Sequence, residues 1–445
     1  MSRQECVEHI VAAVRGAVEG LLESSEAWPA EHWLYAAEQA TRAAAMEVGR
    51  TMLEAMVADR GTGHAGQRIT DAAGRCFTFK QYRRRTVQTL LGPVSVKRAV
   101  YQGPSGPLVP LDEALGVRGE YSEGVEEVVA FTVGQLTYEE TRTLLAKTAG
   151  LRLSATKVQE TAVAWGERAA AEYRQQLPCE EPAARMAVSV DGVMVRTAER
   201  RRKRKGSRKQ HFVEAWREAK LGAVYVFDRA GVANTQKRYV GRLEGKESFA
   251  KALWTRIEAA GADRASEVAW LGDGAAWIWT LKAEILPHAV EILDYRHARD
   301  HLHAVAGSVW GEGSRKARQW LNTQKKRLWT GRVDRVLKEL RRLARQLGPP
   351  PRDASDDDPR RVVASNVTYV ENNASRMRYD EYRRRGYPVG SGVVESACGH
   401  VVAQRMKITS RMSWHARRAE AMLQLRCLIR SGQWDTFWPC CALAA

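Results

Sequence analysis

Three acidic residues lie in or beside largely apolar segments, where a charged side chain indicates a chemical role. Asp191 lies in the middle of AVSVDGVMV, a Val-rich run of strand length, where an ionised carboxylate is costly unless it is paired or coordinates a metal. Asp273 follows the short apolar run VAWL, so it lies at the carboxyl end of a predicted strand, where α/β sheets place their chemistry. Glu395 follows a turn rich in Pro and Gly and opens an amphipathic helix.

The segments around the two aspartates predict a mixed five-stranded sheet. The expected strands, of which the second and third are joined near Gly222, cover residues 187–195, 212–218, 221–227, 268–271 and 290–293. Helices are expected at 246–260 and 276–286. This β-β-β-α-β-α-β order is that of the ribonuclease H fold, which carries one Asp on its first strand and another just after its fourth. The third carboxylate is then expected on a later helix.

The spacing of the three residues predicts an insertion. Asp191 and Asp273 are 82 residues apart (273 − 191), and Glu395 follows after another 122 (395 − 273), which is too long for a simple loop. We expect an all-α insertion at 301–385. Its core candidates are Trp310, Trp320, Leu328 and Trp329.

The remaining sequence predicts further regions. We expect a helical region at 1–60, a small β domain at 61–115, a helical region at 116–182, and a catalytic core at 183–300 and 386–445. Within 116–182, Thr137 and Glu140 have capping-box spacing, Gly150 stops their helix and Ser154 caps the next. This pattern fits a DNA-binding helix-turn-helix, and it fits an ordinary helical hairpin about as well.

The charge balance favours a nucleic-acid partner. Lys and Arg number 70 against 52 Asp and Glu, which gives a net charge of +18 and suits phosphate binding, although basic proteins also bind nucleic acid weakly and without specificity. The basic run in the turn after the first strand, close to Asp191, is expected to grip the DNA backbone rather than form a solvated charge run. It comprises Arg200, Arg201, Arg202, Lys203, Arg204, Lys205, Arg208 and Lys209. Arg405, Lys407 and Arg411 form a second basic stripe or a plain solvated helix face.

Several classes of protein are disfavoured. No run of about 18 apolar residues predicts a membrane span, and the N-terminus does not read as a signal peptide, so a cytoplasmic, nucleoid-associated protein is expected. Seven cysteines without paired spacing indicate reduced thiols. GRLEGKES only imitates a phosphate loop, so no nucleotide cofactor is expected.

Four motifs resemble those of a known family. They are SVDGV around Asp191, LGDGAAWIW around Asp273, LDYRHARDHL around Asp294 and GYPVGSGVVES around Glu395. With these motifs the chain resembles the DDE transposases of bacterial insertion sequences, in the Mutator-like superfamily and close to its ISKra group, over nearly all of residues 85–438.

The resemblance implies a reaction and a set of partners. Asp191, Asp273 and Glu395 would hold two Mg²⁺ ions, which Mn²⁺ can replace, for DNA cleavage by water and strand transfer by a 3′-hydroxyl. The implied partner is double-stranded DNA, both the terminal inverted repeats and the target, bound by a homodimer or larger oligomer. The rival interpretations are a ribonuclease H-fold nuclease or resolvase that cuts without joining, and a domesticated DNA-binding protein without activity.

Two details of the family pattern differ or stay open. Relatives commonly hold paired cysteines before LDEALG, whereas this chain has only Cys76 nearby, which implies a degenerate zinc knuckle. Asp294 and His297 match an accessory D-x-x-H motif of the family. His301 and His303 follow on the same predicted helix, where they could add a zinc site or form a His-rich face near DNA.

Overall fold

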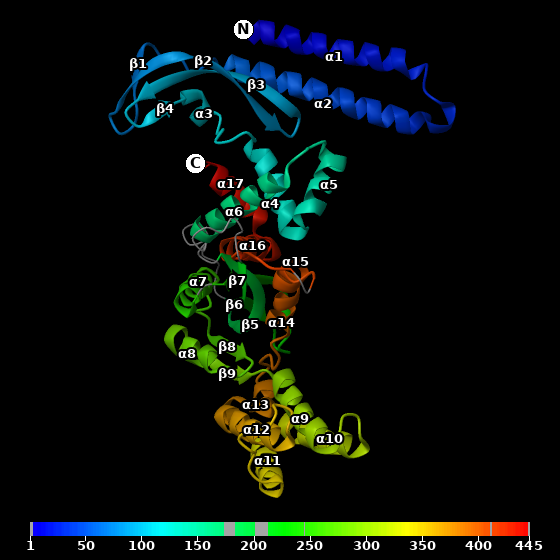
Figure 1. Cartoon of the computed structure of the whole chain (residues 1–445), viewed down its shortest axis with the longest axis vertical. Helices are drawn as coiled ribbons and strands as arrows, with labels where there is room; N and C mark the ends of the chain where they lie inside the picture. Colours follow the sequence, from blue (N-terminus) through cyan, green and yellow to red (C-terminus); the bar gives the residue numbers. More distant parts are fainter. Residues whose placement is uncertain (1–2, 173–182, 201–211, 244, 410–411, 444–445) are drawn as a thin grey trace, which may run out of the picture. The chain divides into compact units, whose positions relative to one another are not determined.

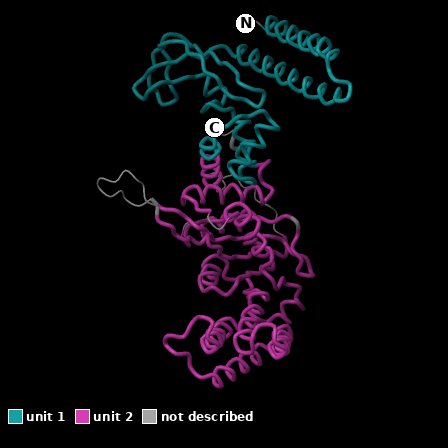
Figure 2. The backbone as a smooth tube through the Cα atoms, turned by 45° about the vertical axis from the view of Figure 1, so that its right-hand side comes forward, with its two compact units in different colours: residues 1–161, 437–445 teal, residues 162–436 magenta. Residues whose placement is uncertain are grey.

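The computed structural model describes the whole chain except residues 1–2, 173–182, 201–211, 244, 410–411 and 444–445. Figure 1 shows its helices and strands. The chain divides into two compact units, of which the first comprises residues 1–161 with 437–445 and the second residues 162–436 (Figure 2). None of the described helices combines the length and the apolar composition needed to cross a bilayer.

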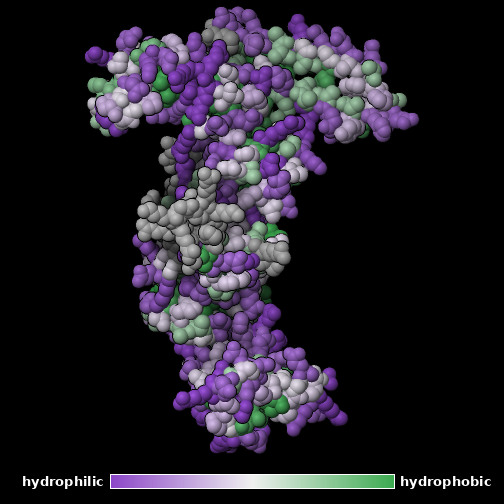
Figure 3. All heavy atoms as spheres, in the orientation of Figure 1, coloured by the Kyte–Doolittle hydropathy of each residue, from purple (hydrophilic) through white to green (hydrophobic). Residues whose placement is uncertain are grey.

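Unit 1 begins with a helical hairpin. Its helices are α1 (Arg3–Ser25) and α2 (Trp33–Asp59), with a 3₁₀ turn at Ala30–His32 between them. The α1 helix carries a stripe of exposed side chains, and Figure 3 shows hydrophobic residues over this hairpin on the face in view. The stripe consists of Val7, Val11, Val14, Val18 and Leu22.

An antiparallel sheet follows the hairpin, as the turn-rich sequence predicts. Its strands, hydrogen-bonded in chain order, are β1 (Arg68–Thr70), β2 (Cys76–Thr89), β3 (Gly92–Gly103) and β4 (Gly106–Leu108). Phe77, Ala99 and Tyr101 form a buried cluster between them, so the sheet is held by side-chain packing. Cys76 is a free, exposed thiol.

Further helices complete the N-terminal part of the chain. They are α3 (Pro110–Ala114), α4 (Glu123–Gln135), α5 (Tyr138–Ala149) and α6 (Ala155–Glu172), and α17 (Trp434–Leu443) lies at the other end of the sequence. The predicted capping box opens α5, where Thr137 Oγ1 accepts from Glu140 N at 3.2 Å and Glu140 Oε2 accepts from Thr137 N at 2.9 Å. Gly150 ends this helix with φ 67°, and Ser154 Oγ accepts from Lys157 N in the next.

Unit 2 is built on a mixed five-stranded sheet of order β7-β6-β5-β8-β9. Its strands are β5 (Arg185–Arg200), β6 (Phe212–Phe227), β7 (Ala233–Arg242), β8 (Glu267–Gly272) and β9 (Val290–Leu293). β5, β6 and β7 pair antiparallel, whereas β8 pairs parallel to β5 and β9 parallel to β8. The chain is therefore a mixed α/β protein with the expected order of elements.

The prediction of two strands joined near Gly222 is wrong. Residues 212–227 form one continuous strand, β6, and the third strand is β7, which the prediction missed. Gly222 pairs with Val190 inside the sheet, and a Cβ there would lie 2.9 Å from Leu253 Cδ1. This glycine therefore serves close packing against α7 (Lys246–Ala259), not a turn. The turn lies instead at Gly231, where φ is 78°.

Helices cover both faces of this sheet. Leu253 of α7 lies against Gly222, and Leu423 of α16 (Ala416–Arg430) lies against Gly241 next to Leu221. Because neighbouring residues of a strand point to opposite faces, α7 and α16 lie on opposite sides. Asp191 pairs directly with Leu221 and shares its face, which is the face of α16.

The predicted insertion is helical. After α8 (Ala276–Ile285) and β9 come α9 (Tyr295–Trp310), α10 (Arg315–Trp329), α11 (Val333–Leu347), α12 (Pro359–Asn373) and α13 (Tyr379–Arg384). Of the four predicted core residues Leu328 is buried, whereas Trp310, Trp320 and Trp329 are half-buried. The chain then returns to the sheet through α14 (Gly392–Ala397), a π-helical turn at Cys398–Ala403 and α15 (Gln404–Met406).

Candidate functional site

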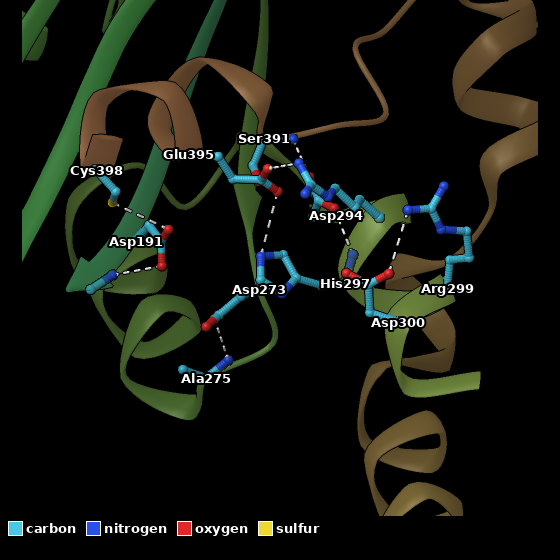
Figure 4. Close-up of polar contacts among 12 residues, drawn as sticks. Asp191, Asp273, Ala275, Asp294, His297, Arg299, Asp300, Ser391, Glu395 and Cys398 are labelled. Atoms are coloured by element: carbon cyan, nitrogen blue, oxygen red, sulfur yellow. Dashed lines mark hydrogen bonds and ion pairs between the residues drawn. The ribbon is translucent and has the colours of Figure 1, made fainter. Parts of the chain in front are cut away.

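Two carboxylates of the site are held at strand positions by their own backbone. Asp191 lies in β5, where its Oδ1 accepts a hydrogen bond from Gly192 N at 2.7 Å (Figure 4). Asp273 follows β8, and its Oδ1 accepts from Ala275 N at 2.9 Å in the turn that opens α8. Each carboxylate is therefore oriented by a bond within two residues along the chain.

The surroundings of Asp191 raise the pKa of its carboxyl group, so they disfavour its charged form. Burial raises the pKa of Asp191, and the nearby Asp273 carboxylate adds to the increase, while hydrogen bonds from Gly192 N and the Cys398 thiol oppose it. The thiol lies 3.4 Å from Asp191 Oδ2. Burial and the Asp191 carboxylate in turn raise the pKa of Cys398. Two close carboxylates in a largely buried setting favour binding of a cation.

The third carboxylate, Glu395 of α14, is held by side chains from other segments. Arg296 Nη1 donates to its Oε2 at 2.7 Å. On its other oxygen, Oε1, His297 Nε2 lies at 3.6 Å and Ser391 Oγ donates at 3.5 Å. Figure 4 shows Glu395 turned toward His297 of α9. The negative charge of Glu395 is thus paired with the positive charge of the Arg296 guanidinium.

Asp294 joins the first turn of α9 to the loop before α14. Its Oδ1 caps α9 by accepting from His297 N at 2.8 Å, and its Oδ2 accepts from Ser391 N. The residue is completely buried. Tyr295 N adds a bond to Val389 O at 2.9 Å. Asp294 therefore positions both His297 and the turn that carries Glu395.

The described residues contain one group of three side chains that could hold a metal. Ligand atoms of Asp294, His297 and Glu395 lie within 4.8 Å of one another. Asp191, Asp273 and Glu395 do not form such a group in this structure, because Glu395 is turned toward Arg296 and His297. Since both oxygens of Asp294 accept backbone hydrogen bonds, the atoms best placed to exchange partners belong to Glu395 and His297.

Comparison with known proteins gives little further information. No protein family model and no curated protein matches the sequence. A solved structure described as "Drosophila P element transposase strand transfer complex" matches with 10% sequence identity, covering 73% of this chain and 95% of that chain, at a TM-score of 0.35. A likeness at this level does not establish a shared fold or function, so the role of this site has to be inferred from its own side chains.

The helical insertion touches the site through Tyr369 of α12. Its hydroxyl donates to the backbone carbonyl of Asp273 at 2.7 Å, and its ring stacks on His301 of α9 with centroids 3.6 Å apart. His301 Nδ1 also lies 2.9 Å from Asn366 Oδ1, and burial lowers the pKa of His301. His301 is thus engaged inside the insertion. Neither it nor the exposed His303 joins a three-ligand group among the described residues.

The residues predicted to contact DNA differ in their exposure, and several of them lie outside the described part of the chain. Arg405 is 1% exposed, with its guanidinium 5.1 Å from the Trp414 ring centroid, so its assignment to a basic surface stripe is wrong. Lys407 is exposed, and Arg411 lies outside the described residues. Residues 201–211 also lie outside the described part, which leaves the basic run untested. Its first member, Arg200, ends β5 nine residues beyond Asp191, or about 30 Å along the strand.

Sequence reasoning missed three residues of the site. Cys398 lies three residues after Glu395, a spacing that places both on one helix face and could have indicated it. Arg296 lies inside the D-x-x-H motif, but its side chain carries no signal of its own. Tyr369 lies 96 residues from Asp273, within an insertion whose docking no pattern predicts.

Proposed function

We propose that this chain is a DDE transposase with a ribonuclease H-like core, which binds the ends of an insertion sequence and catalyses metal-dependent DNA cleavage and strand transfer. The strand order and directions of the five-stranded sheet support the core assignment. The motifs around Asp191, Asp273, Asp294 and Glu395 support the Mutator-like, ISKra-type assignment.

The observation that carries this proposal is the meeting of residues far apart in sequence. The charges of Asp273 and His297 both act on the pKa of Asp191, and His297 Nε2 lies 3.6 Å from Glu395 Oε1. His297 therefore lies near both Asp191 and Glu395, and Asp273 lies near Asp191. Oxygen ligands of this kind are the ones that Mg²⁺ prefers.

Asp191, Asp273 and Glu395 would hold two divalent cations. When bound, such ions activate an attacking oxygen and stabilise a leaving oxygen at phosphorus. The residues of the chain supply orientation: the Gly192 and Ala275 amides fix the two aspartates, and Asp294 fixes the turn that carries Glu395. No covalent enzyme intermediate is required, because water and then a 3′-hydroxyl act as the nucleophiles.

Glu395 has to change partners for this role. Its carboxylate is paired with Arg296 and faces His297 rather than the two aspartates. We expect the side chain to reorient by rotation about its own torsions, while the turn before α14 stays anchored through Ser391 N.

The test is a cleavage and joining assay. Purified protein is incubated with Mg²⁺, a linear DNA that carries the sequences flanking the gene, and a target plasmid, and the products are sequenced across the junctions. We expect ends with free 3′-hydroxyls and covalent joints to the target, which disappear in Asp191→Asn, Asp273→Asn and Glu395→Gln.

The outcomes separate the rival functions. Cleaved ends without joints would indicate a nuclease or resolvase. A band shift without cleavage would indicate a DNA-binding protein that has lost the reaction. Full cleavage and joining by any one of the three variants would refute the role of that carboxylate.

A further inference from the structure

We propose that Arg296 is a placeholder cation: its guanidinium occupies Glu395 Oε2 while the site holds no metal, and a divalent cation has to displace it. The inference rests on the proposed function, because it takes Glu395 to be a metal ligand. It assigns Arg296 a positioning role that neither its motif nor any similarity indicates.

The two oxygens of Glu395 are held in unequal ways. Oε1 faces His297 Nε2 at 3.6 Å and Ser391 Oγ at 3.5 Å, and Asp294 anchors both of those residues through their backbone. The other oxygen, Oε2, accepts a hydrogen bond from Arg296 Nη1 at 2.7 Å. The exchangeable partner is therefore the one on Oε2.

The solvent exposure of the two side chains indicates which member of the Arg296–Glu395 pair moves when a metal ion binds. The side chain of Arg296 is 64% exposed, whereas that of Glu395 is 19% exposed. The guanidinium can leave into water, where it keeps its hydration, but the carboxylate would be left partly buried without a counter-charge. An arriving metal ion supplies that counter-charge, so Arg296 leaves and Glu395 stays.

A matched control lies one turn further along the same helix. Arg299 forms its ion pair with Asp300, at 3.4 Å, and its side chain is 40% exposed. Replacing Arg299 removes the same charge from α9 while the Glu395 pair stays intact. The comparison therefore separates displacement at Glu395 from a general loss of positive charge.

The experiment measures metal binding without DNA, so it does not depend on activity. Mn²⁺ binding to the full chain is followed by the loss of free-ion EPR signal for the parent, Arg296→Gln, Arg299→Gln and Asp273→Asn. A solvent-exposed ion pair of this kind is worth under about 1 kcal/mol, so Arg296→Gln should bind Mn²⁺ about two- to fivefold more tightly than the parent. Arg299→Gln should match the parent.

Each result has one meaning. Equal or weaker Mn²⁺ binding by Arg296→Gln, or an equal gain in Arg299→Gln, overturns the placeholder role while the metal site stands. Parent protein that binds no Mn²⁺, or binds it equally well after Asp273→Asn, overturns the metal site and with it both proposals. Circular dichroism of all four proteins verifies that each is folded.

Discussion

The two sides of the site are built by different means. On the strand side, Asp191 and Asp273 take their orientation from amides within two residues of each. On the helix side, Glu395 takes its orientation from Arg296 and His297, about a hundred residues earlier in the chain. The strand side is thus set as soon as the sheet forms, whereas the helix side depends on α9 docking beside α14.

This difference indicates how such a site can be both precise and adjustable. Backbone bonds leave a carboxylate little freedom, while exposed side-chain partners can be exchanged at low cost. We therefore expect substitutions of the carboxylates to have the largest effects, substitutions of the anchors on the helix side intermediate ones, and substitutions of remote supports small ones.

The largest effect is expected from the carboxylates themselves. Asp191→Asn, Asp273→Asn and Glu395→Gln should each lower the cleavage rate by about a thousandfold or more, since each removes a ligand charge that acts in the transition state. Gel quantification of cleaved DNA measures the rate, and band shifts should show unchanged DNA binding. A Glu395→Gln variant that loses less than tenfold would make the helix side dispensable.

Asp294→Asn should have an intermediate effect. The amide can accept only one of the two backbone N–H bonds well, so positioning of Glu395 should suffer and activity or metal affinity should fall about ten- to a hundredfold. Cleavage rates over a Mg²⁺ titration measure this loss. Asp358→Asn is the matched control, because Asp358 caps α12 in the same way through Arg360 N. Equal losses of activity in both variants would show that Asp294 acts only as a helix cap and does not position Glu395.

Tyr369→Phe should have a smaller effect on cleavage. The substitution removes the hydroxyl that holds the Asp273 carbonyl, a bond worth about 1 kcal/mol, so a loss of about three- to tenfold is expected. Tyr382→Phe removes an equivalent bond, to Glu291 O of β9 at 2.9 Å, away from the carboxylates. Thermal unfolding of both variants corrects for stability. The support role fails if both lose the same activity.

The smallest effect concerns stability and its dependence on pH. Since the folded pKa of Asp191 is raised, its contribution to stability is present at low pH and is lost as the pH rises through that pKa. Asp191→Asn should therefore stabilise the metal-free protein near neutral pH, with no such gain below the ordinary range of aspartate. Urea unfolding at several pH values measures this.

Asp358 provides a control of opposite sign. Its hydrogen bond with Arg360 lowers the pKa of Asp358 to about 2, so its contribution is present at neutral pH and is lost in acid. Asp358→Asn should then destabilise near neutral pH and have a vanishing effect in acid. An Asp191→Asn protein that is destabilised at neutral pH would contradict the raised pKa of Asp191.

Much of the fold could be predicted from the sequence, because its signals are local. Short apolar runs predict β5, β8 and β9, and the capping box at Thr137 predicts the start of α5. The missed strand, β7, carries polar residues along ANTQKRYVGR, so its pattern did not stand out. The prediction of a turn at Gly222 is wrong for a related reason, because a glycine required for close packing looks in sequence like a glycine required for a turn.

The site was predictable only in part. Asp191, Asp273 and Glu395 could be singled out because a carboxylate beside apolar runs is unusual, but their partners could not. Arg296 and Tyr369 are ordinary residues on helices, and their roles arise from the docking of α9 and α12. Arg405 shows the opposite error, since a charged residue was assumed to be exposed and is buried against Trp414.

The unbroken pairing of β5 with β6 sets a length scale for any bound duplex. The register runs without a shift from Met186 opposite Val226 to Arg200 opposite Phe212. Arg200 is therefore about 30 Å along the strand from Asp191, which corresponds to about nine base pairs of B-form DNA. On the proposed function, the far end of β5 would therefore be too distant from the scissile bond of a duplex aligned with this strand to take part in the chemistry.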